Sequence, residues 1–156
     1  MIDGNVGGLN MLGLGVASQE WSSNGQGVGA WIQLNFTSTY LMKQVVLFDR
    51  VNTLNSITGG TLRFSEGSSF KVTALSPSGS TVSLGTAGIY ASSLRFTVTS
   101  VSLTTTAVGL AEIQIFNGAC VLLSCTAIPL AHLTSLPRSP AASTTLVGSL
   151  LSLFGL

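Results

Sequence analysis

Apolar and polar residues alternate through much of residues 1–117, and a period of two predicts β-strands rather than helices. In one such run Leu94, Phe96 and Val98 are apolar, so we expect them to face the interior. The residues between them, Arg95 and Thr97, would face the solvent. The segments with strand patterns are Ala30–Phe36, Lys43–Asp49, Thr61–Ser65, Ser69–Leu75, Ser80–Leu84, Leu94–Val98 and Val108–Phe116. Short strands at fairly regular spacing, without an amphipathic helix, predict an all-β, antiparallel jelly-roll sandwich.

The alternation also predicts which side chains share a face of a sheet, because successive strand residues point to opposite sides. In residues 43–49 one face would carry Val45, Leu47 and Asp49, and the other Val46 and Phe48. In residues 108–116 one face would carry Leu110, Glu112, Gln114 and Phe116, and the other Ala111, Ile113 and Ile115. In residues 30–36 the inward side chains would be Trp31 with Leu34, or Ile32 with Phe36.

Ser76-Pro77-Ser78-Gly79 predicts a turn, because proline fixes φ and glycine tolerates positive φ. We expect Ser80–Leu84 to pair back across this turn with Ser69–Leu75 as a hairpin.

The composition changes at residue 118, which predicts a domain over residues 1–117 and a tail over residues 118–156. The tail has Arg138 as its single charged residue, and its apolar runs are shorter than the roughly 20 residues of a membrane helix. It is either an irregular or partly helical extension or a lipid-anchor signal. Cys120 and Cys125 either form a disulfide that closes a small loop or stay as thiols.

Charge is scarce, since Lys and Arg number 6 and Asp and Glu number 5, with a net charge of +1. Many Ser and Thr residues with few charges suit a β-rich exterior. The chain has no basic cluster in its sequence, which argues against nucleic-acid binding.

Several segments together suggest a family. They are Ile2-Asp3-Gly4-Asn5, Ala30–Phe36, Val46–Arg50 and Gly109–Ile113. In this order they resemble the galactose-binding-like β-sandwich of discoidin and coagulation-factor type C domains and of many carbohydrate-binding modules. Glu20-Trp21, Asn24-Gly25-Gln26-Gly27 and Phe48-Asp49-Arg50 are similar to a subgroup in secreted, mainly fungal proteins.

This resemblance, which covers residues 2–116, implies a non-catalytic extracellular binding module whose ligand is a carbohydrate. It also implies a first strand before Asp3 that this chain lacks, and no secretory signal stands at the start of the sequence. The alternative is a structural module that packs against a neighbouring catalytic domain, of the deacetylase-like or glycan-processing kind.

The resemblance further implies a structural calcium ion that ties the loop after the first strand to the last strand. Calcium takes carboxylate, amide and backbone carbonyl oxygens together. The matching positions are Asp3, Asn5, Gly8, Ala111 and Glu112. The alternative is that Asp3 is a turn residue and Glu112 makes an ordinary hydrogen bond or ion pair.

Sugar recognition needs an aromatic face and planar polar groups, and such residues cluster in two segments. The candidate ligand-binding residues are Glu20, Trp21, Asn24, Asp49, Arg50 and Asn52. The competing interpretation is structural, with Asp49 and Arg50 paired to Arg63 or Glu66. We also expect Trp21 and Trp31 in the core rather than as platforms.

Nothing in the sequence argues for catalysis. The one histidine, His132, lies in the tail, and no nucleophile elbow or phosphate-binding glycine loop is present. Membrane binding through loop tips such as Leu54 and Ile57 would need basic neighbours, and only Arg50 and Arg63 are close in sequence.

Overall fold

The computed structural model describes residues 20–118 except residue 53, and this part of the chain is built of β-strands without a helix. The strands are β1 (Trp21–Ser22), β2 (Trp31–Met42), β3 (Gln44–Asp49), β4 (Ile57–Phe64), β5 (Ser69–Val72), β6 (Ser80–Ser83), β7 (Ile89–Val101) and β8 (Gly109–Phe116). The predicted all-β class is confirmed.

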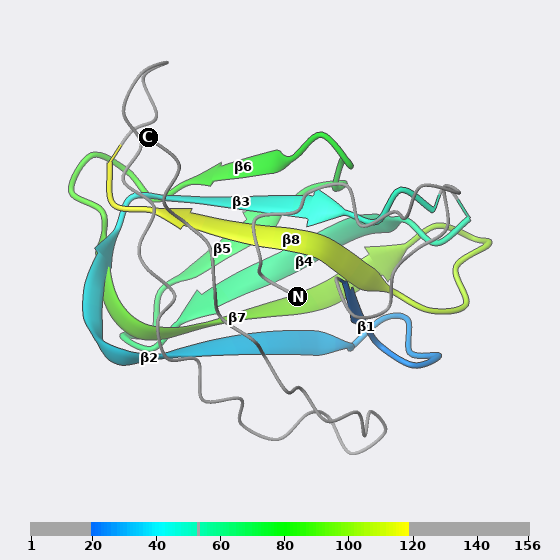
Figure 1. Ribbon diagram of the computed structural model, residues 1–156, viewed down its shortest axis with the longest axis horizontal. Coiled ribbons are helices and arrows are strands. Elements are labelled where there is room, and N and C mark those ends of the chain that lie inside the picture. Colours follow the sequence, from blue (N-terminus) through cyan, green and yellow to red (C-terminus); the bar gives the residue numbers. More distant parts are fainter. Residues whose placement is uncertain (1–19, 53, 119–156) are drawn as a thin grey trace, which may run out of the picture.

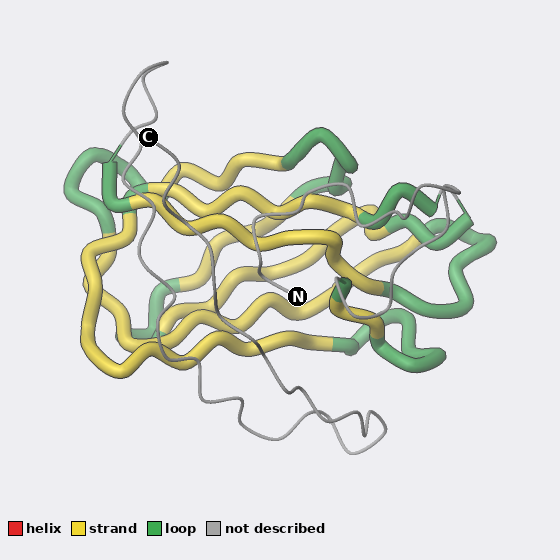
Figure 2. Tube along the Cα trace, viewed as in Figure 1, coloured by secondary structure: helices red, strands yellow, loops and turns green. Residues whose placement is uncertain are grey.

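The strands form two antiparallel four-stranded sheets, with the orders β1-β8-β3-β6 and β2-β7-β4-β5. The sheets lie over one another as two layers (Figures 1 and 2). This arrangement is the sandwich that the strand pattern predicted.

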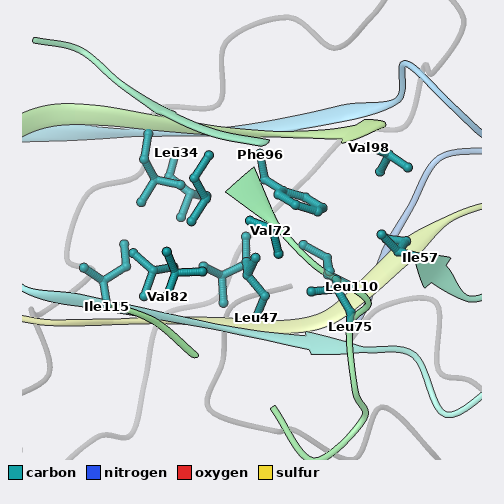
Figure 3. Packing of buried hydrophobic residues seen from close by; sticks show 14 of the residues in the cluster. Leu34, Leu47, Ile57, Val72, Leu75, Val82, Phe96, Val98, Leu110 and Ile115 are labelled. Atoms are coloured by element: carbon teal, nitrogen blue, oxygen red, sulfur yellow. The ribbon is translucent and has the colours of Figure 1, made fainter. Parts of the chain in front are cut away.

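The core lies between the two sheets, and each sheet contributes its inward side chains to it. Figure 3 shows Leu34 and Phe96 from β2 and β7 facing Leu47 and Ile115 from β3 and β8. Each is at most 5% exposed. The alternation predicted for β7 is confirmed, because Leu94, Phe96 and Val98 are all buried while Arg95 is exposed.

In β2 the inward residues are Ile32, Leu34 and Phe36, all of which belong to or pack against the core. Trp31 is half-buried on the opposite face, so the expectation that it lies in the core is wrong. The guanidinium carbon of Arg95 lies 4.2 Å from the centroid of the Trp31 ring, and this contact supplies the ring with a partner outside the core.

The predicted hairpin between Ser69–Leu75 and Ser80–Leu84 is also wrong. β5 pairs with β4 in one sheet, whereas β6 pairs with β3 in the other. The turn itself is present, with Gly79 at a φ of 100° and its N–H donating to the Ser76 carbonyl at 3.0 Å. The chain therefore crosses between the sheets here.

In β3 the predicted faces are confirmed, since Val45 and Leu47 join the core and Val46 and Phe48 join a second apolar cluster. The prediction for β8 fails at its start. Opposite β3, the ladder passes from Phe48 paired with Glu112 to Asp49 paired with Leu110, and Ala111 is the extra residue. Such a bulge changes the phase of alternation, so Leu110 is buried in the core together with Ile113 and Ile115.

Candidate functional site

Three loops meet at one end of the sandwich: residues 23–30 after β1, 50–56 after β3 and 102–108 after β7 (right side of Figure 1). Hydrogen bonds join each of the first two loops to the third. Val108 N–H donates to the Gln26 carbonyl at 3.0 Å, and Thr106 N–H donates to Oδ1 of Asn55 at 2.9 Å. The loop end is therefore cross-linked by its own polar groups.

Glu20 and Arg50 form an ion pair at the base of these loops, with Nε donating to Oε2 at 2.5 Å. The side chains are 2% and 17% exposed, respectively. The sequence placed both residues in one candidate site, and the structure brings them into direct contact. The competing interpretation paired Arg50 with Glu66. In the structure Arg50 pairs with Glu20 instead.

Asp49 is buried beneath the loop that follows β3. Its Oδ1 accepts from Arg50 N–H at 2.9 Å, and its Oδ2 accepts from Ile57 N–H at 3.2 Å. Burial raises the pKa of Asp49 to about 6, while these two hydrogen bonds and the Arg50 charge act in the opposite direction. Both oxygens bind backbone, so this side chain fixes the loop between β3 and β4.

Trp21 is a core residue, as expected, and does not offer its ring to a ligand. Asn24 and Asn52 are exposed in two different loops. Asn24 has a φ of 49°, and Oδ1 of Asn52 accepts from Leu54 N–H at 3.0 Å. Of the six predicted ligand-binding residues, these two asparagines and part of Arg50 remain accessible.

The loop tips carry exposed aliphatic side chains that the sequence analysis largely missed. They are Val28, Val51, Leu54 and Leu103. Ile57, in contrast, is fully buried, so the expectation that it is a loop-tip residue is wrong. The sequence signal that could have identified these side chains is an apolar residue within a loop rich in Ser, Thr and Asn.

Two of the predicted calcium ligands lie in β8. Ala111 is fully buried, and Glu112 is 1% exposed with its Oε1 accepting from Ile113 N–H at 3.0 Å. Asp3, Asn5 and Gly8 lie outside the described residues. Within residues 20–118 no three His, Cys, Asp or Glu side chains gather as a metal site. The five residues together would still supply the mixture of oxygen donors that calcium accepts.

Cys120, Cys125 and His132 lie outside the described residues as well. In the part of the chain that the structure describes, no helix has the length and hydropathy needed to cross a membrane.

The family whose model matches this chain is described as a domain of unknown function (DUF7402), and the match covers residues 1–116. A search of curated proteins gives no significant match. Among solved structures the chain is similar to the CBM32 of AlyQ in complex with 4,5-unsaturated mannuronic acid. The two share 22% sequence identity over 75% of this chain and 83% of that chain, with a TM-score of 0.52. This likeness supports the galactose-binding-like fold.

Proposed function

Because this chain belongs to the DUF7402 family, whose function is unknown, we propose from its own loops that it is a non-catalytic, extracellular carbohydrate-binding module. The observation that carries the proposal is the cross-linked loop end, where Glu20 holds Arg50 and two of the loops carry the exposed Asn24 and Asn52. Guanidinium and amide groups on fixed loops suit sugar hydroxyls, because pre-ordered donors lose little entropy on binding. The similar module was itself solved with a bound sugar.

The test is binding of the full chain to a glycan array, followed by calorimetric titration of galactose, galacturonate and the strongest ligand on the array. Replacing Asn24 and Asn52 together with alanine should weaken binding roughly tenfold. This estimate follows because each hydrogen bond contributes about 0.5–1.5 kcal/mol. Asn117→Ala, an exposed asparagine beyond the end of β8, is the matched control and should bind as wild type. Equal losses in both variants, or a folded double variant that keeps full affinity, would contradict the assignment of the loop end.

A second candidate function follows from the aliphatic loop tips. Leu54 is 63% exposed and lies in the same loop as Asn52, and Leu103 stands exposed in the loop after β7. Such side chains suit packing against a protein surface, as in a module that supports a neighbouring catalytic domain. A silent glycan array for the folded chain would favour this function.

We also propose a structural calcium ion held by Asp3, Asn5, Glu112 and the carbonyl oxygens of Gly8 and Ala111. The support is the buried Glu112 carboxylate, because a cation would offset the cost of its burial. When bound, the ion would tie the segment around Asp3 to β8.

Calcium should therefore raise the unfolding temperature of the chain relative to the same sample in a chelator. Calcium at a 100-fold excess over Kd adds about 2.7 kcal/mol, which corresponds to roughly 13 °C for a domain of about 100 residues. Glu112→Gln should abolish the increment, whereas Glu66→Gln, an exposed acid, should keep it. The absence of a calcium response in the wild-type chain would rule out the site.

A further inference from the structure

Three cations share the outward face of the β2-β7-β4-β5 sheet. Arg63 in β4 and Arg95 in β7 are directly opposite in the ladder. Lys71 in β5 pairs with Thr61, so it is the diagonal neighbour of Arg63. All three cations are exposed, while their neighbours along the strands point into the core.

No acid neutralises this face within the described residues. Glu20, Asp49 and Glu112 are buried elsewhere, and Glu66, in the turn after β4, accepts hydrogen bonds from Ser68. The one ion pair of that part of the chain joins Glu20 to Arg50. Like charges directly opposite in a ladder destabilise a sheet. The chain therefore carries an electrostatic cost here that a bound anion would remove.

Arg95 is already positioned by its neighbours on β2. Its guanidinium lies over the Trp31 ring, and its Nε donates to Oε1 of Gln33 at 2.8 Å. Nε2 of Gln33 in turn donates to Oδ1 of Asn35 at 2.8 Å. Among the described residues, Arg95 uses one of its five N–H donors, in the hydrogen bond to Gln33. The others remain to bind an anion in a fixed orientation.

We infer that this face, comprising Trp31, Gln33, Arg63, Lys71 and Arg95, is a second binding surface, for an acidic polysaccharide. Guanidinium groups match carboxylate and sulfate oxygens, often through paired hydrogen bonds. The amides of Gln33 and Asn35 and the hydroxyl of Thr61 suit a ligand rich in hydroxyl groups. The cations span neighbouring strands about 4.8 Å apart, so a polymer lying across the strands meets several of them.

A nucleic acid fits this face less well. Single-stranded nucleic acids bind through aromatic rings on which successive bases stack. Trp31 is the one aromatic residue among those that form the face, and the Arg95 guanidinium already lies over its ring. A chain of anionic sugars needs no such platform.

The experiment measures binding of the full 156-residue chain to immobilised polygalacturonate, its methyl-esterified form, heparin and a single-stranded oligonucleotide. We expect binding to polygalacturonate or heparin, weakened by salt, and little binding to the ester. A preference for polygalacturonate would identify the anion as carboxylate, whereas a preference for heparin, which carries both groups, would show that sulfate contributes to binding. Arg63→Gln with Lys71→Gln should weaken this binding about tenfold or more, as expected for the loss of two charge-assisted contacts.

Lys43→Gln and Asn24→Ala with Asn52→Ala are the control variants. Lys43 is a half-buried cation between β2 and β3, at the opposite end of β2 from Trp31 and Gln33. Its variant should change affinity less than about twofold, because charges more than a Debye length apart are largely screened. The asparagine variant alters the loop end and should keep full binding to the acid polymer. The inference would be overturned if the Arg63–Lys71 variant bound the acid polymer undiminished, or if the ester bound as well as polygalacturonate. It would also be overturned if the oligonucleotide bound more tightly than the acid polymers, or if neither acid polymer bound. Loss of binding in the asparagine variant alone would assign the acid polymer to the loop end instead.

Discussion

Replacing Arg50 with alanine should lower the free energy of unfolding by about 3–5 kcal/mol, because it leaves the Glu20 carboxylate buried without its charge partner. The Glu20 side chain is 2% exposed, so water cannot replace the guanidinium without opening the structure. The substitution also removes the aliphatic part of Arg50, which lies close to Gly109. Urea unfolding of the full chain, followed by tryptophan fluorescence, measures the change.

Two variants separate the ion pair from a general effect of removing arginine. Arg63→Ala removes an exposed arginine that has no ion pair among the described residues, and it should change stability by less than about 0.5 kcal/mol. Glu20→Gln combined with Arg50→Gln replaces both charges by neutral amides and should recover part of the loss, because neither partner is left as a buried charge. If Arg50→Ala were as stable as Arg63→Ala, the Glu20 carboxylate would have to be solvated in the native state and not buried against Arg50.

The alternation of apolar and polar residues was enough to predict strands that have one face in the core and the other in solvent. Leu94, Phe96 and Val98 in β7 alternate with polar residues because one face meets the core and the other meets solvent. Val45 and Leu47 in β3 followed the same rule. The sequence therefore predicted the sandwich and much of its core.

Sequence could not predict the strand partners, because a turn has the same local chemistry whichever sheet the next strand joins. The turn that ends at Gly79 is present as expected, yet β6 pairs with β3 and not with β5. Long-range packing decides this, since Val72 and Val82 approach the core from opposite sheets. The bulge at Ala111 likewise depends on the register with β3, which no local signal specifies.

The candidate site was predictable in part. Glu20 and Arg50 are thirty residues apart in sequence, and the family resemblance placed both in one candidate site. Their ion pair and their burial could not be predicted from the sequence and are seen only in the structure. The cations of Arg63, Lys71 and Arg95 are equally scattered in sequence. Their common face follows from the registers of three strands, so the three cations do not form a basic cluster along the sequence.

Gly109→Ala should destabilise the chain by about 1–3 kcal/mol or more, because strands β1 and β8 approach too closely at this position for a Cβ atom. A Cβ at residue 109 would lie 2.2 Å from the Trp21 carbonyl oxygen and 2.5 Å from Cδ of Arg50. The carbonyl belongs to the short strand that carries Trp21 into the core, and Arg50 is held by Glu20, so neither atom can move without breaking a buried contact.

Gly27→Ala is the matched control at the same end of the sandwich. No atom lies within 4 Å of a Cβ at Gly27, and its φ is not positive, so alanine there should be neutral or stabilise the fold by up to about 1 kcal/mol. Chemical unfolding of the two variants should therefore give changes of opposite sign or very different size. If Gly109→Ala proved as stable as Gly27→Ala, β1 could not be packed against β8 as described, and the buried position of Glu20 next to Arg50 would fall with it.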